Sequence, residues 1–156
     1  MGSGKSTPIT FSLPFATGAF KIDGMNQQPT AAAPALDRQS QLAAGRQLAI
    51  EAARLAANTM CHNVVVLDVS HISPVADYFV IATGTSARQM RTVADETDQL
   101  ATARSYRALA RDGYEGASWI LCDYVDVILH LFDDQARAYY DLDNLWGDAP
   151  RVAWQP

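Results

Sequence analysis

The sequence predicts an α/β domain built on a mixed β-sheet of about five strands, with helices packed on it. The first observation is the run SWILCDYVDVILHLF at residues 118–132, which is rich in the β-branched and aromatic residues that favour strands. The second is the alternation of short apolar runs with longer helical patterns elsewhere in the chain. The third is size, because 156 residues suffice for one domain with a substantial core.

The run at residues 118–132 predicts a β-hairpin. Its middle holds the tetrad Asp123, Tyr124, Val125 and Asp126, so WILC and VILHLF become two arms folded back through that tetrad. The run is also too short to cross a bilayer as a helix, which takes about 20 residues. Both faces of each arm are mostly apolar, so we expect the hairpin inside a sheet that helices cover on at least one side.

The other elements follow from periodicity. Ser86 followed by Gln89 matches a capping box, so a helix is expected to begin there. The inner side of that helix is expected to carry Met90, Val93, Ala94, Thr97, Leu100 and Ala101. In chain order we expect a helix at residues 40–58, strands at 64–69 and 77–83, the helix from residue 86, a weaker strand at 106–110, the hairpin, and a short helix from Asp133 or Asp134 to about residue 141.

Composition divides the chain into a tail and a domain. Residues 1–37 are dominated by Pro, Gly, Ser, Thr and Ala without a lasting apolar period, which predicts a disordered or weakly ordered tail. The folded domain is expected at residues 38–152, with a short C-terminal tail at 153–156. Within the first tail, GKS at residues 4–6 resembles the end of a phosphate-binding loop. Pro8 follows directly after Thr7, where a helix would be needed, so a chance match is favoured.

The charge distribution bears on the kind of partner. The net charge is −5, and from Val64 onward seven Arg, no Lys and fourteen acidic residues give 7 − 14 = −7. This balance argues against nonspecific wrapping of nucleic acid and suits docking on a basic protein, although it could also serve solubility alone. Cys61 and Cys122 show no disulfide-framework spacing, which predicts a reducing compartment and a cytoplasmic location. No membrane association is expected.

Two candidate chemistries are weak. A nucleotide transferase would need metal-binding acids after a Gly-Ser turn, but Asp95 and Asp98 follow the turn on a predicted helix, where we expect them on a solvated face. Cys61, Cys122 and His130 could in principle bind zinc together with His62, yet their spacing matches no closed zinc site. We therefore expect no metal, no cofactor and no catalytic residue, and we interpret His130 as a core or boundary histidine.

The acids near the strands have two interpretations that the pattern supports equally. Asp is common at turns and strand ends, which would account for Asp77, Asp123 and Asp126. Acids beside exposed aromatic residues can instead form a recognition patch for a basic partner, with Trp119 and Tyr124 as anchors.

Three segments carry a resemblance to a known family. VVVLDVSHISPVADYFVIATGTSARQ, WILCDYVDVILHLF and YYDLDNLWGDAP occur in that order, and together they cover about residues 63–152. In these segments the chain resembles the ribosomal silencing factor family, also called Iojap. The resemblance implies a fold related to nucleotidyltransferases, but without their catalytic acids and without enzymatic activity.

The resemblance also implies a partner. Members bind large-subunit ribosomal protein fourteen at the face that meets the small subunit. They thereby block subunit joining and lower translation when nutrients are short, and organelle relatives act in large-subunit assembly. On this chain it implies partner contacts at Trp119, Asp123 and Tyr124, and secondarily at Asp77 and Tyr78.

One departure from the family lies in the hairpin turn. Val125 stands where the family usually has Gly, and a positive φ at this position would be costly for a β-branched residue. Two alternatives to a ribosome-binding factor stay open. One is a nucleotidyltransferase-like enzyme. The other is a homodimeric module whose aromatic patch pairs with itself.

Overall fold

The computed structural model describes residues 37–156. The elements in chain order are α2 (Arg38–Asn58), β2 (His62–Asp68), β3 (Tyr78–Thr83), α3 (Ala87–Ala103), β4 (Ala110–Asp112), β5 (Trp119–Asp123), β6 (Val127–Phe132), α4 (Asp134–Tyr140) and α5 (Leu142–Leu145). The expected tail, apart from Asp37, and its GKS motif lie outside the described residues.

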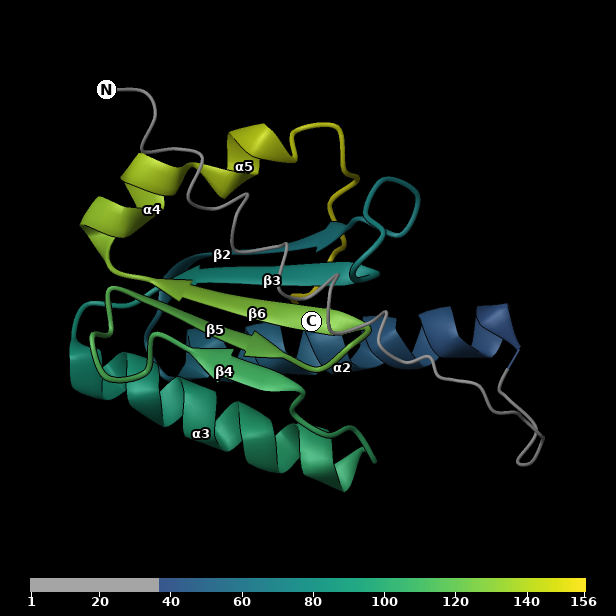
Figure 1. Ribbon diagram of the computed structural model, residues 1–156, viewed down its shortest axis with the longest axis horizontal. Coiled ribbons are helices and arrows are strands. Elements are labelled where there is room, and N and C mark those ends of the chain that lie inside the picture. The colour runs from purple at the N-terminus through teal and green to yellow at the C-terminus, as the bar shows by residue number, and fades with distance from the viewer. Residues whose placement is uncertain (1–36) are drawn as a thin grey trace. The chain divides into compact units, whose positions relative to one another are not determined.

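The strands form one five-stranded sheet in the order β2-β3-β6-β5-β4 (Figure 1). β3 and β6 run parallel and the other neighbours run antiparallel, so the sheet is mixed and the expected fold class is confirmed. The predicted hairpin is β5–β6. Every residue of β3 and β6 is buried, as expected for apolar strands in the middle of a sheet.

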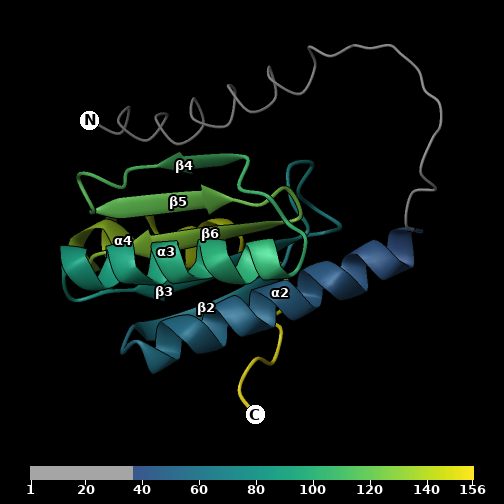
Figure 2. The same cartoon turned by 90° about the horizontal axis from the view of Figure 1, so that it is seen from below.

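Helices cover both faces of this sheet. α2 and α3 lie side by side across one face (Figure 2), where alternate strand residues such as Val80, Cys122 and Leu129 join the main core. Gly45 lets α2 approach the sheet closely, because a Cβ there would meet the Tyr78 ring at 3.3 Å. α4 and α5 lie toward the opposite face (Figure 1), which we call the α4 face.

The start of α3 confirms the predicted cap, with one difference. The Ser86 side chain accepts from the Gln89 N–H at 3.1 Å, as a capping box requires. The Gln89 side chain, however, accepts from the N–H of Thr85 rather than that of Ser86. Of the six residues expected on the inner side of α3, all except the partly buried Leu100 are buried.

The predicted strand at residues 106–110 is wrong, because β4 occupies Ala110–Asp112 instead. β4 pairs with β5 from Ala110 opposite Asp123, which is where β5 ends. Leu109 still donates its N–H to the Asp123 carbonyl at 2.7 Å, but the paired register with β5 begins only at Ala110. The short helix α5 was also not predicted.

The end of the chain packs along the outer edge of β2. The Val152 N–H donates to the Val66 carbonyl at 2.9 Å, and the Trp154 indole donates to the Val64 carbonyl at 3.2 Å. Trp154 is partly buried and packs against the core. Within residues 37–156, no helix has both the length and the apolar character needed to cross a membrane.

Candidate partner-docking site

The predicted contact residues separate toward two ends of the β5–β6 hairpin. Trp119 begins β5, whereas Asp123 ends it four residues and about 13 Å further along. Asp77 and Tyr78 lie at the Asp123 end, because their backbone N–H groups donate to the Asp126 carbonyl at 2.8 and 3.0 Å. The residues that sequence reasoning grouped into one patch therefore belong to two different environments.

The first environment is a cluster of rings. Trp119 stacks on Phe132 with ring centroids 5.0 Å apart, and its ring lies 4.4 Å from that of Tyr140. Tyr139 meets Tyr140 edge-on at 4.9 Å and is 64% exposed. We call Trp119, Phe132, Tyr139 and Tyr140 the aromatic end. Aromatic side chains with one buried and one accessible side are typical anchors of protein–protein interfaces.

His130 connects Trp119 to the middle of the sheet. The Trp119 Nε1–H donates to Nδ1 of His130 at 3.2 Å, and Phe79 packs edge-on against the imidazole. Burial lowers the pKa of His130 to about 3, so the ring is neutral near pH 7. Because Nδ1 accepts, the ring proton lies on Nε2, and this buried atom has no hydrogen-bond partner in the structure described. His130 is thus a core histidine, as interpreted, with one unsatisfied donor.

The second environment, which we call the turn end, consists of Asp77, Tyr78 and residues 123–126. Arg38 donates two hydrogen bonds to the Asp77 carboxylate, at 3.0 and 2.6 Å. Tyr78 is buried against Gly45 of α2. Neither predicted contact therefore presents an exposed side chain.

Asp123 and Tyr124 are also directed inward. The Asp123 carboxylate accepts from the Val125 N–H at 2.8 Å, as an Asp that stabilises a turn does, and burial raises its pKa. Tyr124 is 1% exposed, and its hydroxyl donates to Asp98 of α3. The expectation that Tyr124 is an exposed anchor is wrong, because its ring belongs to the core on the side of α2 and α3.

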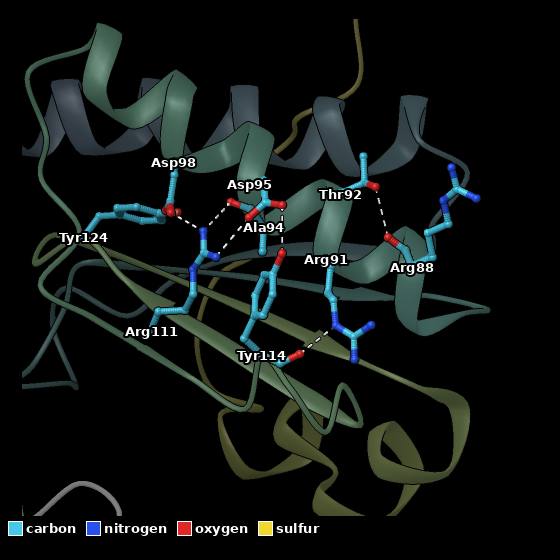
Figure 3. A network of polar contacts seen from close by, with 9 residues as sticks. All are labelled: Arg88, Arg91, Thr92, Ala94, Asp95, Asp98, Arg111, Tyr114 and Tyr124. Atoms are coloured by element: carbon cyan, nitrogen blue, oxygen red, sulfur yellow. Dashed lines mark hydrogen bonds and ion pairs between the residues drawn. The ribbon is translucent and has the colours of Figure 1, made fainter.

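A polar network ties the edge of the sheet to α3 (Figure 3). Arg111 of β4 forms ion pairs with both Asp95 and Asp98. The Tyr114 hydroxyl donates to Asp95 at 2.9 Å, and the Tyr114 ring lies against the Arg111 guanidinium. Asp95 and Asp98 do lie on a partly solvated face of α3, with side chains 48% and 32% exposed, but they also form ion pairs and hydrogen bonds that the sequence did not predict. These carboxylates fix β4 and the loop after it onto α3.

Val125 adopts the costly conformation anticipated for the turn. Its φ is 76°, and the Asp126 N–H donates to the Tyr124 carbonyl at 2.9 Å, a pattern that matches a positive-φ γ-turn. The side chain is 53% exposed, so little packing compensates for the backbone strain. A left-handed conformation costs a residue other than glycine about 1–2 kcal/mol.

The candidate zinc ligands do not converge. Cys122 faces the core beneath α2 and α3, whereas His130 faces the other side of the sheet. Burial raises the pKa of Cys61 and of Cys122 to about 11, which keeps both thiols protonated. Across residues 37–156, no three potential metal ligands of the His, Cys, Asp and Glu types come together.

Sequence reasoning missed Tyr139 and Tyr140 as site residues. A signal was present, because two adjacent aromatic residues in a helix as short as α4 point in different directions. One of them can pack on the sheet while the other stays exposed. Tyr140 takes the first place, beside Trp119, and Tyr139 takes the second.

Comparison with known proteins gives the family. A family model described as "Ribosomal silencing factor during starvation" matches residues 43–156. The chain belongs to the ribosomal silencing factor family. A ribosomal silencing factor from Halalkalibacterium halodurans is 43% identical over 89 residues, which are 57% of this chain and 76% of that protein. The chloroplastic protein Iojap of Arabidopsis thaliana is 30% identical over 104 residues, 67% of this chain and 43% of that protein.

Solved structures share the fold of this silencing-factor family member. A protein from Bacillus halodurans aligns with a TM-score of 0.58 at 34% identity, covering 74% of this chain and 99% of that one. A Chromobacterium violaceum protein aligns with a TM-score of 0.60 at 28% identity, covering 69% and 85%. The resemblance drawn from the three sequence segments is confirmed.

Proposed function

We propose that this ribosomal silencing factor docks on large-subunit ribosomal protein fourteen and sterically blocks joining of the two ribosomal subunits. The repression would act in the cytoplasm, especially when nutrients are limiting. The mechanism requires no reaction at this chain, only occupation of a surface that the small subunit needs.

The aromatic end carries the proposal. Of the five residues predicted to contact the partner, Trp119 alone is not buried. Phe132 and Tyr140 flank its ring and His130 accepts from its N–H, so the indole is held in place before a partner arrives. A pre-positioned aromatic anchor lowers the ordering cost of binding.

A groove beside these rings extends the surface. It has a volume of about 380 Å³ and is lined by Ser118, Asp133, Gln135, Ala136, Tyr139 and Tyr140. Asp134, the first residue of α4, has a side chain that is 74% exposed. Together with the excess of acidic residues from Val64 onward, this supports docking on a basic protein.

Co-sedimentation tests the proposal. Purified large subunits, small subunits and joined ribosomes are each mixed with the parent protein, with Trp119→Ala and with Trp154→Ala. Trp154 is a matched control, because it is another partly buried tryptophan with a hydrogen-bonded indole, and it packs at the β2 edge. We expect the parent and Trp154→Ala to bind large subunits and prevent joining, and Trp119→Ala to bind much more weakly.

Two results would count against the proposal in different ways. If the parent binds no subunit, the docking function fails, and a mass twice that of the chain would favour the self-pairing alternative. If both tryptophan variants bind like the parent, docking stands but the aromatic end is not its interface. Circular dichroism melting of each variant separates lost docking from lost folding.

A further inference from the structure

His130 is an unusual residue for its position. β6 reads Val-Ile-Leu-His-Leu-Phe, all of it buried, and His130 is its only polar side chain. An apolar residue there would avoid both the desolvation of an imidazole and the unsatisfied Nε2–H. Buried polar atoms without a partner are rare in folded proteins, so this one calls for a specific explanation.

The two ring nitrogens face different surroundings. Nδ1 is bonded to Cγ, the ring carbon that joins the imidazole to Cβ, and it accepts the Trp119 N–H. Nε2 lies at the far edge of the ring, away from the backbone of β6. Because Val127, Leu129 and Leu131 face α2 and α3, His130 projects to the α4 face, together with Trp119. The unsatisfied donor thus lies on the same side of the sheet as the proposed docking anchor.

We propose that Nε2–H of His130 is a hydrogen-bond donor that a main-chain carbonyl of the docked partner completes. The inference rests on the proposed function, because it places the partner at the aromatic end. Docking beside Trp119 would leave the indole on Nδ1 and bring the partner's backbone to the other nitrogen, Nε2. His130 would then position the anchor through one nitrogen and bind the partner through the other.

A carbonyl suits this donor better than a charged acceptor. Phe79, Trp119 and Phe132 surround the imidazole, so the surroundings are apolar. A carboxylate brought there would be desolvated beside a neutral ring, without a compensating cation. A neutral carbonyl satisfies the donor without adding buried charge, and a completed buried hydrogen bond is worth more than the same bond at the surface.

Two substitutions separate the roles of the nitrogens. In His130→Asn the side-chain oxygen can take the place of Nδ1, and nothing replaces Nε2. In His130→Gln the amide N–H can reach the position of Nε2, and no acceptor replaces Nδ1. The measurements are the dissociation constant for purified large subunits and the NMR signal of the Trp119 indole N–H in the free protein.

We expect His130→Asn to keep the indole signal near its parent position and to bind about tenfold more weakly, the effect of one lost buried hydrogen bond. In His130→Gln we expect the NMR signal of the Trp119 indole N–H to shift away from its parent position. We also expect this variant to bind large subunits more tightly than His130→Asn does. The inference is overturned if His130→Asn binds like the parent, because Nε2 would then form no hydrogen bond with the partner. It is also overturned if His130→Gln binds no better than His130→Asn.

Thr97→Val supplies the matched control. In residues 37–156, Thr97 Oγ1 is the other buried side-chain polar atom without a hydrogen-bond partner, and it lies on α3 on the opposite side of the sheet. Its removal is expected to leave docking unchanged. Trp119→Ala, measured in parallel, distinguishes the two proposals. If Trp119→Ala weakens docking and His130→Asn does not, only this inference fails, and if the parent does not dock, both fail.

Discussion

The two ends of the β5–β6 hairpin use similar residue types for different purposes. At the turn end, Asp77, Asp123 and Tyr124 are buried, and each forms a hydrogen bond within the chain. At the aromatic end, Trp119 and Tyr139 keep part of their surface accessible. The turn end therefore stabilises the hairpin, whereas the aromatic end keeps aromatic side chains partly accessible.

The difference teaches that an aromatic residue next to an acid in sequence is not by itself a recognition patch. Tyr124 lies next to Asp123 in the chain, but its hydroxyl is bound by Asp98, which is 26 residues away in sequence. Whether such a residue contacts a partner depends on which face of the sheet it occupies.

The largest expected difference is between Trp119→Ala and Tyr124→Phe. Trp119→Ala should weaken docking on large subunits by at least about 2 kcal/mol, as expected for an interface anchor. Tyr124→Phe should leave docking unchanged and lower the free energy of unfolding by about 2 kcal/mol, because it removes a hydrogen bond to a carboxylate. Binding curves and urea unfolding measure the two effects. Weaker docking of Tyr124→Phe at unchanged stability would show that the turn end also contacts the partner.

The next effect is a pH dependence that originates from His130. Its pKa is lowered from 6.5 to about 3 in the folded protein, so between these values the unfolded chain binds a proton that the folded chain does not. Stability should therefore fall as pH drops below 6.5, by up to about 1.4 kcal/mol per pH unit from this group.

Urea unfolding of the parent and of His130→Asn between pH 4 and 6 isolates the effect. The pKa values of Asp123 and Asp126 are raised, which acts with the opposite sign but is common to both proteins. Equal pH slopes for the two proteins would show that His130 is not buried as a neutral group.

A smaller effect is expected at the hairpin turn. Val125→Gly should stabilise the protein by about 1 kcal/mol, because glycine adopts a φ of 76° without strain and offsets part of this gain through its greater unfolded-state entropy. Val75→Gly is the control, since Val75 is also partly exposed and its φ is not positive. Thermal melting measures both. A loss of stability in Val125→Gly would mean that the exposed Val125 side chain stabilises the turn by more than its strain costs.

The smallest effect concerns the support of the aromatic end. Arg137 of α4 donates to Asp143 at 3.0 and 3.1 Å and to Thr83 at 2.7 Å, which joins α4, α5 and β3. Hydrogen bonds from Arg137 lower the pKa of Asp143 against the opposing effect of burial. Asp143→Asn should lower the free energy of unfolding by about 0.5 kcal/mol near pH 7, because it removes a partly exposed ion pair.

This difference between the parent and Asp143→Asn should shrink as pH falls below about 3.8 through the folded pKa of Asp143, since the carboxylate is then protonated. Exposed Asp148→Asn is the control and should leave the free energy of unfolding near pH 7 unchanged. A difference that persists at low pH would assign the effect to packing rather than to charge.

Much of the fold could be predicted because its signals are local. The apolar run with a polar tetrad gave the hairpin, and Ser86 with Gln89 gave the start of α3. The weak strand was misplaced because β4 has only three residues, and its position depends on where β5 ends. The candidate site was predicted less well. Trp119 is accessible as expected, whereas Tyr124 and Asp77 are engaged by Asp98 and Arg38 from distant helices.

The sequence by itself determined the class of the fold, the order of its main elements and the backbone strain at Val125. It could do so because periodicity, capping and φ preferences act between near neighbours in the chain. The tertiary structure decided which face each hairpin residue occupies and which side chains meet there. Trp119 rests on His130, 11 residues away, and Arg111 joins Asp95 across 16 residues. Such contacts arise only when strands pair and helices pack, and this is why the accessible aromatic end became distinct from the buried turn end only in three dimensions.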